Sequence, residues 1–173
     1  MAIEHSEQYI FLVDDEPIQN EMLKDHISSL FEYKLKTYES GEDALKDMHL
    51  NPAIVVLDFH LNSHLPDAQN GVEVLKKIKE ISPHTEVIML SGQDQISVAT
   101  DSMKHGAYDY VVKGETAFHR IENIVDNIIE LHSLKDANSS YKKVIGFLWL
   151  GVALVVAASI ALAIYMTKVR HYS

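Results

Sequence analysis

The stretch NPAIVVLDFH, residues 51–60, decides the fold of this chain, because it joins an unbroken apolar run to a carboxylate. The run from Ala53 to Leu57 suits a strand that is covered on both faces, as in parallel sheets. Asp58 follows the run directly, and a buried carboxylate is costly unless it is paired or bound to a cation. The stretch therefore predicts a central strand that ends at a functional group.

Strand and helix patterns alternate on both sides of this stretch, which predicts an α/β domain with a parallel sheet. The expected strands are 9–13, 35–38, 54–57, 86–90 and 108–112. The expected helices are 16–30, 42–49, 71–81, 96–105 and 116–134. Pro17 favours the start of the first of these helices. Five β/α units thus fill residues 9–134.

The composition of the chain excludes several classes of function. It has 25 acidic and 15 basic residues, a formal net charge of -10. Binding to the phosphates of nucleic acid needs basic surface, so we expect no nucleic-acid partner. The chain has no cysteine, which excludes disulfides and thiolate metal sites. Its ten histidines form no His-x-x-x-His pair on an expected helix, so the sequence predicts no zinc site.

The C-terminal part of the chain differs in kind from the rest. Residues 144–166, VIGFLWLGVALVVAASIALAIYM, contain no charge. A helix of about 20 residues is enough to cross the hydrocarbon core of a bilayer. Residues typical of membrane interfaces lie near the ends of the run: Lys142, Lys143, Trp149, Tyr165, Lys168 and Arg170. We expect a transmembrane helix at 143–167, a polar linker at 135–142 and a short tail at 168–173, with a buried core helix as the alternative.

Polar side chains follow four of the expected strands. Asp14 and Asp15 follow the first strand, Asp58 the third, Ser91 the fourth and Lys113 the fifth. These groups share one edge of a parallel sheet, where ligands of open α/β sheets bind. Three carboxylates there would repel one another without a cation, and Mg²⁺ prefers such oxygen ligands and often shares a site with phosphate. The set suits phosphoryl transfer, with a carboxylate nucleophile that forms an aspartyl phosphate.

The segments YIFLVDDEP, AIVVLDFHL, VIMLSG and GAYDYVVKG resemble the receiver domain of two-component response regulators, over residues 8–134. The resemblance implies a flavodoxin-like (βα)5 doubly wound parallel sheet with strand order 2-1-3-4-5. It implies Asp58 as the phosphoacceptor. It also implies Mg²⁺ ligands from four residues: Asp14, Asp15, Asp58 and the main-chain carbonyl of His60.

The resemblance further implies that Lys113 contacts the phosphoryl group and that Ser91 and Tyr110 form a switch pair. Phosphorylation would draw Ser91 toward the phosphoryl oxygens and turn Tyr110 inward. A strand-end hydroxyl and a core aromatic are the alternatives for these two residues. Two features depart from the family: the loop after Asp58 is longer, and Lys113-Gly114 replaces Lys-Pro, so no cis-proline is expected there.

The sequence thus predicts a membrane-tethered single-domain response regulator that is phosphorylated on Asp58. Its phosphodonor would be a histidine kinase or a phosphotransfer protein. It would catalyse its own phosphorylation and dephosphorylation, and we expect no other enzymatic activity. The alternatives are a degenerate receiver that acts as a membrane adaptor, and an aspartyl-phosphate phosphatase of the haloacid dehalogenase type. The phosphatases need Asp-x-Asp, and here His60 holds the third position.

The expected location is the cell inner (cytoplasmic) membrane, with a single pass and the receiver domain facing the cytoplasm. The N-terminus MAIEHSEQYI has no basic region followed by an apolar one, so no signal peptide is expected. The transmembrane helix would insert late, as a tail anchor. A homodimer is among the expected assemblies of this chain.

Overall fold

A computed structural model describes residues 8–61, 70–92 and 96–171, and it describes the side chains of only some residues after 135. The chain divides into two compact units, Met1–Ile128 and Ile129–Ser173. The predicted long loop after Asp58 falls mainly on residues 62–69, outside the described residues.

The first unit contains a five-stranded, fully parallel sheet with the order β2-β1-β3-β4-β5. The strands are β1 (Tyr9–Val13), β2 (Lys34–Tyr38), β3 (Ile54–Asp58), β4 (Glu86–Ser91) and β5 (Asp109–Val112). The predicted strand order and the flavodoxin-like α/β fold are therefore confirmed. Asp58 and Ser91 are the last residues of their strands, not the first residues after them, because each still pairs with a neighbouring strand.

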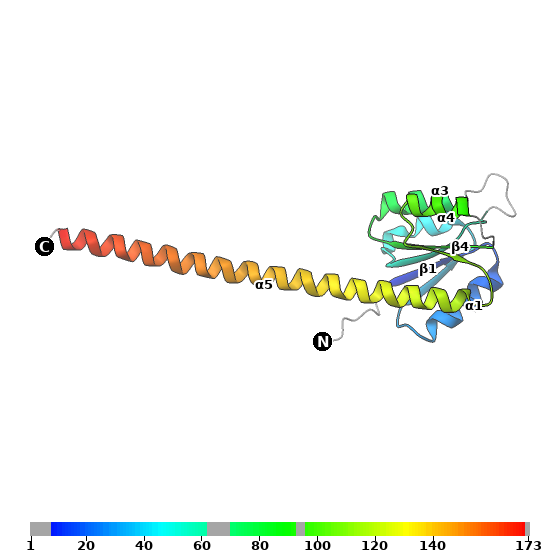
Figure 1. Cartoon of the computed structure of the whole chain (residues 1–173), viewed down its shortest axis with the longest axis horizontal. Helices are drawn as coiled ribbons and strands as arrows, with labels where there is room; N and C mark the ends of the chain where they lie inside the picture. The colour runs from blue at the N-terminus through cyan, green and yellow to red at the C-terminus, as the bar shows by residue number, and fades with distance from the viewer. Residues whose placement is uncertain (1–7, 62–69, 93–95, 172–173) are drawn as a thin grey trace. The chain divides into compact units, whose positions relative to one another are not determined.

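Helices cover both faces of this sheet. They are α1 (Pro17–Ser28), α2 (Gly41–Lys46), the short 3₁₀ helix η2 (Met48–Leu50), α3 (Gly71–Ile81), α4 (Ile96–Lys104) and α5 (Ala117–His171). In the first unit, α1 and the start of α5 lie on one side of the sheet, and α3 and α4 lie on the other (Figure 1). The predicted helix 42–49 is in fact two elements, α2 and η2, and Asn51 ends the second with a positive φ of 50°.

The core of the first unit has two layers, because successive strand residues point to opposite faces of the sheet. On one face, strand residues such as Phe11 and Leu57 pack with Val74 and Leu75 of α3. The other face buries the apolar residues of α1 and of the start of α5: Leu23, Ile27, Ile121, Ile124, Val125 and Ile128. Residues 54–57 of β3 are buried, as the apolar run predicts, and Asp58 at the end of the strand is buried with them. Asp58 therefore enters the protein interior as part of a core strand.

The helix α5 continues past the point where the sequence predicts its end. The expected helix end at residue 134 is wrong, since α5 is continuous from Ala117 to His171, and the polar linker at 135–142 stays a prediction. The physical reason is that residues 136–140 are mostly polar but include neither glycine nor proline, so nothing in the backbone interrupts the helix.

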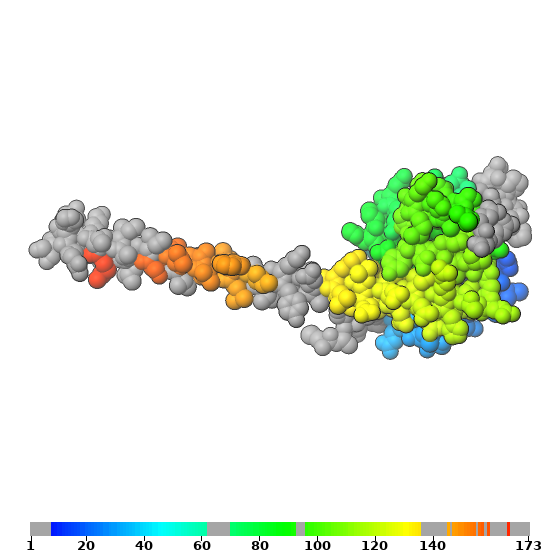
Figure 2. Space-filling model, viewed as in Figure 1, coloured from blue at the N-terminus to red at the C-terminus, as the bar shows by residue number. Residues whose placement is uncertain are grey.

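The expected transmembrane helix at 143–167 includes many residues whose side chains lie outside the described set. Within the part of the chain that the structure describes, no helix is both long enough and apolar enough to cross a membrane. Several large apolar side chains between residues 145 and 156 (orange in Figure 2) are exposed, among them Phe147 and Trp149, at 74% and 69%. The transmembrane helix and the tail at 168–173 stay predictions.

Candidate functional site

Three strand ends bring two carboxylates and one ammonium group together at one edge of the sheet. Asp58 ends β3, Asp14 directly follows β1, and Lys113 directly follows β5. The Nζ of Lys113 lies 2.7 Å from Oδ2 of Asp14 and 3.2 Å from Oδ1 of Asp58. Asp14 and Asp58 are only 4% and 2% exposed. The predicted convergence of these residues is therefore present, and Lys113 bridges the two acids.

The third predicted acid, Asp15, completes a cluster that suits a divalent cation. Asp14, Asp15 and Asp58 each offer one oxygen within 4.8 Å of the others. The Oδ2 of Asp15 is buried and accepts no hydrogen bond within the described residues. Three carboxylates and the ammonium group of Lys113 leave a local charge of about -2 when all are ionised. A hard divalent cation that prefers oxygen ligands, such as Mg²⁺, fits both the charge and the donor set.

Burial makes the Asp58 carboxyl unusually basic. Loss of water around it, together with the charge of Asp14, raises its pKa from 3.8 to about 6, although Lys113 acts in the opposite direction. Burial alone would lower the pKa of Lys113, but its hydrogen bond to Asp14 and the charge of Asp58 outweigh that effect, so the pKa is raised. Lys113 is therefore a permanent cation at this edge, whereas the protonation of Asp58 depends on its neighbours.

Asn20 holds the backbone of this edge in place, and the sequence analysis did not include it. Its Nδ2 donates hydrogen bonds to the carbonyl oxygens of Asp14 (2.8 Å) and Tyr38 (2.9 Å), at the ends of β1 and β2. The backbone N–H of Glu16 donates to Oδ1 of Asp14 at 2.9 Å. Asn20 is 2% exposed and precedes the buried Leu23 by one helical turn. A polar residue on the apolar face of a predicted helix is the signal that could have identified it.

The segment after Asp58 is held close to the start of α3. The N–H of Phe59 donates to the carbonyl of Leu90 at 2.8 Å, and the N–H of Gly71 donates to the carbonyl of Phe59 at 2.9 Å. A side chain at position 71 would collide with the Asp58 carbonyl oxygen and with Cα of Phe59. Glycine is therefore required at this position by close packing against the backbone of Asp58 and Phe59.

Ser91 lies at the predicted edge, and its main chain connects β4 to β5. It is 1% exposed, and its carbonyl oxygen accepts a hydrogen bond of 2.7 Å from the N–H of Lys113. The described residues contain no cis peptide bond, which agrees with the prediction for Lys113-Gly114. Ser91 therefore has the position that the switch role needs, one strand away from Asp58.

Tyr110 is already inside the domain. It is 9% exposed and belongs to the core cluster that includes Val87 and Met89. Tyr110 is thus buried in this structure, and its role in a switch pair with Ser91 stays a prediction. His60 lies two residues past Asp58, and its ring stands edge-on to the ring of Phe59, with 4.8 Å between the ring centroids. The role of its main-chain carbonyl in binding a metal stays a prediction.

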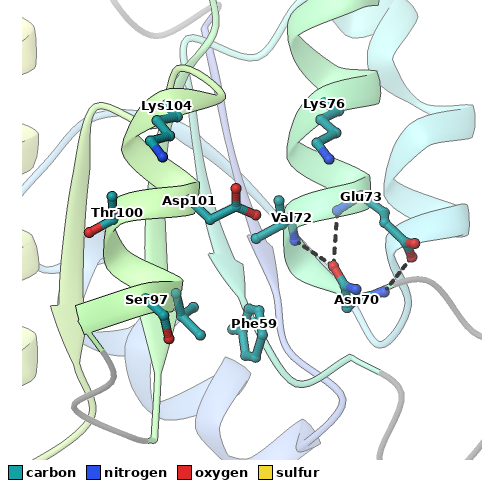
Figure 3. A pocket seen from close by; sticks show the side chains of 10 residues that line it. Phe59, Asn70, Val72, Glu73, Lys76, Ser97, Thr100, Asp101 and Lys104 are labelled. Atoms are coloured by element: carbon teal, nitrogen blue, oxygen red, sulfur yellow. Dashed lines mark hydrogen bonds between the residues drawn. The ribbon is translucent and has the colours of Figure 1, made fainter.

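A cleft of about 640 Å³ opens between α3 and α4, beside the acidic edge and not on it. Figure 3 shows Lys76 and Lys104 on its two helical walls, with Asp101 between them and Phe59 at one end. Asn70 and Glu73 form a capping box at the start of α3, in which Oδ1 of Asn70 accepts hydrogen bonds from Val72 and Glu73. Because Phe59 directly follows Asp58, this cleft borders the end of β3.

Comparison with known proteins agrees with this geometry. The family model of the response regulator receiver domain matches residues 10–126. The chain is similar to the chemotaxis protein CheY of Thermotoga maritima, with 30% identity over 105 residues, which cover 60% of this chain and 83% of CheY. It is 24% identical to the transcriptional regulatory protein MalR of Bacillus subtilis over 108 residues. That match spans 60% of this chain but only 43% of the length of MalR.

Among solved structures, the chain is similar to the BeF3-activated receiver domain of DrrB, a Thermotoga maritima protein. The two are 30% identical with a TM-score of 0.57, and the match covers 69% of this chain and 97% of that domain. The matched family model spans more than half of the chain and contains the acidic edge, Ser91 and Lys113. The chain therefore belongs to the family of response regulator receiver domains.

Proposed function

We propose that this protein is a membrane-tethered response regulator that accepts a phosphoryl group on Asp58 from a histidine kinase or a phosphotransfer protein. The observation that carries the proposal is the buried Asp58, with Lys113 Nζ 3.2 Å from its Oδ1 and with Asp14 and Asp15 beside it. A buried carboxylate beside a lysine ammonium group suits phosphoryl transfer, in which positioning and neutralisation of charge do most of the work.

The bond that forms and the bond that breaks in the transfer involve only Asp58 and the donor. A carboxylate oxygen of Asp58 attacks the phosphorus of a phosphohistidine, so that a P–O bond forms while the P–N bond breaks. The donor imidazole leaves as the neutral base after it takes up a proton from solvent. The ammonium group of Lys113, now shared between Asp14 and Asp58, is close enough to Asp58 to neutralise charge on the transferred phosphoryl oxygens.

Asp14, Asp15 and Asp58, with the carbonyl of His60, would hold Mg²⁺ at this edge. The cation would supply neutralisation of the carboxylate and phosphoryl charges. The Oδ2 of Asp15 supports this assignment, because it accepts no hydrogen bond from the described residues, and a buried carboxylate oxygen is costly unless it is paired or bound to a cation. Self-catalysed phosphorylation and dephosphorylation at this edge are part of the proposal, and we assign no further enzymatic reaction to the chain.

The phosphodonor must approach Lys113 and Asp58 from solvent. A cleft of about 370 Å³ between α1 and the start of α5 is lined by Lys113, Phe118 and Met22, among other residues. Met22 is 53% exposed, and Ile18, one turn earlier on α1, is 74% exposed. Exposed apolar residues beside a polar reactive edge are typical of a protein-docking surface. We therefore assign donor docking to this face.

The acceptor is tested with acetyl phosphate and beryllofluoride on purified residues 1–136. We expect labelling that requires Mg²⁺ and is absent from both Asp58→Asn and Asp58→Ala. Stable labelling supports the receiver, and rapid turnover of phosphoesters would indicate the phosphatase. If neither is observed, the membrane adaptor is the remaining alternative. Equal labelling of Asp58→Ala and the unmodified domain would contradict the assignment of Asp58.

The tether is proposed for residues 143–167 on the strength of the uncharged run, with the exposed apolar side chains of this segment as support. The receiver domain would face the cytoplasm, where the phosphodonor is, and confinement to the bilayer would raise its effective concentration near a membrane-bound kinase. Cell fractionation tests this: the full chain should sediment with inner membranes, and a chain cut after residue 136 should not. A full chain that stays in the supernatant would contradict the tether while leaving Asp58 chemistry unaffected.

A further inference from the structure

A second group of ligating side chains lies away from the acidic edge, where the last turn of α1 meets the start of α5. It consists of His26 on α1 and of His119 and Glu122 on α5. The Nε2 of His26 and the Nδ1 of His119 each lie 3.1 Å from the same atom, Oε2 of Glu122. All three residues belong to the first unit of the chain. No part of the proposed phosphoryl transfer uses them.

The spacing of these atoms matches a tetrahedral metal site. Ligands about 2.0–2.1 Å from Zn²⁺ lie roughly 3.3 Å from one another in tetrahedral geometry. In the structure, both imidazole nitrogens lie 3.1 Å from Oε2 of Glu122, and the three ligating atoms all lie within 4.8 Å of one another. Two imidazoles on one zinc place their ring centroids about 5 Å apart, and those of His26 and His119 are 6.0 Å apart. Small side-chain rotations therefore suffice to admit a cation.

The fold positions these side chains through two different constraints. His119 and Glu122 are three residues apart on α5, which places them on the same face of the helix. His26 comes from α1, 96 residues earlier than Glu122, and its ring packs on the ring of Phe118 at 5.7 Å. The side chains of His26 and Glu122 are about one quarter exposed, whereas that of His119 is 77% exposed. The site is therefore supported from inside and open to solvent on one side.

We propose that His26, His119 and Glu122 form a Zn²⁺ site, with a water molecule in the fourth position, that links α1 to the start of α5. Two imidazole nitrogens and one carboxylate oxygen are ligands that suit Zn²⁺, whereas Mg²⁺ prefers oxygen ligands alone. The two sites of this domain thus select different metals: the acidic edge takes the hard cation, and the His26 site takes zinc. No sequence motif indicates the zinc site, since its ligands come from two distant helices.

The test is a Zn²⁺ titration of the full chain in detergent, with millimolar Mg²⁺ present to fill the acidic edge and a chromophoric chelator as competitor. We expect one tight site per chain. His26→Gln and His119→Gln should each weaken it by about 100-fold or more, because loss of a ligand costs at least as much as loss of a supporting contact. Glu122→Gln should have the same effect without a change of shape.

His105→Gln is the matched control, because His105, directly after the end of α4, also lies near a carboxylate, with its Nδ1 3.4 Å from Oδ1 of Asp101 on that helix. It should keep the affinity of the unmodified chain. As a second measurement, the ring signals of His26 and His119 in NMR spectra of the unmodified chain should shift together at one equivalent of Zn²⁺. Unchanged affinity in both His26→Gln and His119→Gln, an equal loss in His105→Gln, or ring signals that do not respond would each overturn the proposal.

Discussion

Replacement of Asp58 by asparagine should make the stability of the domain less sensitive to pH. Asp58 is 2% exposed, and its pKa in the folded domain is about 6, because it is buried beside Asp14. An unfolded chain has no such burial, so there the carboxyl keeps its ordinary pKa of 3.8. Since each pKa unit corresponds to about 1.4 kcal/mol, ionising Asp58 costs the folded state about 3 kcal/mol.

The sign follows from the raised pKa. The folded state holds the proton of Asp58 more tightly than the unfolded state does. The contribution of Asp58 to the free energy of unfolding is therefore largest below pH 4, and it falls as the pH rises through 6. An asparagine side chain at this position cannot ionise, so Asp58→Asn should gain about 3 kcal/mol relative to the unmodified domain between pH 4 and pH 7.5. Mg²⁺ should reverse part of that gain, because a cation that binds only the folded carboxylate contributes about 2.7 kcal/mol at 100 times its Kd.

The assay is urea unfolding of residues 1–136, followed by far-UV circular dichroism from pH 4 to pH 7.5, first with chelator and then with Mg²⁺. Asp126→Asn is the control, since Asp126 is exposed on α5, and its effect should stay within about 0.5 kcal/mol at every pH. A difference between Asp58→Asn and the unmodified domain that does not change with pH would refute the reasoning. It would mean that Asp58 is not desolvated in the folded protein.

Two further predictions concern the neighbours of Asp58. Ser91→Ala should still be labelled by beryllofluoride, but the NMR shifts around Tyr110 should be smaller than in the unmodified domain. The reason is that the variant lacks the hydroxyl group that would move toward the phosphoryl oxygens, and identical shifts would contradict the coupling. Gly71→Ala should destabilise the domain by about 1–3 kcal/mol in urea unfolding, because its Cβ meets the backbone at Asp58. Gly114→Ala is the control, since an added Cβ there meets nothing within 4 Å, and equal losses in both variants would contradict the packing argument.

The order of strands and helices along the chain was predictable from the sequence, because each sequence pattern that indicates such an element is short-range. An apolar run such as 53–57 predicts a buried strand by itself, and the alternation of runs predicts a parallel sheet. The rule that carboxyl ends of parallel strands share one edge then places Asp14, Asp58 and Lys113 together without coordinates. Helix ends were predicted less well. Residues 136–140 are mostly polar, which suggested a linker, but they contain neither glycine nor proline, and the structure has them helical.

Burial and long-range pairing could be decided only by the tertiary structure. The pKa of Asp58 depends on how much water the packed elements exclude and on the distance to Asp14, which sequence spacing does not contain. The burial of Tyr110 depends likewise on which elements cover β5. His26 and Glu122 lie 96 residues apart and meet only because α1 and α5 pack on the same face of the sheet. Sequence patterns report which groups a strand or helix presents, whereas distances between elements arise only when the whole core packs.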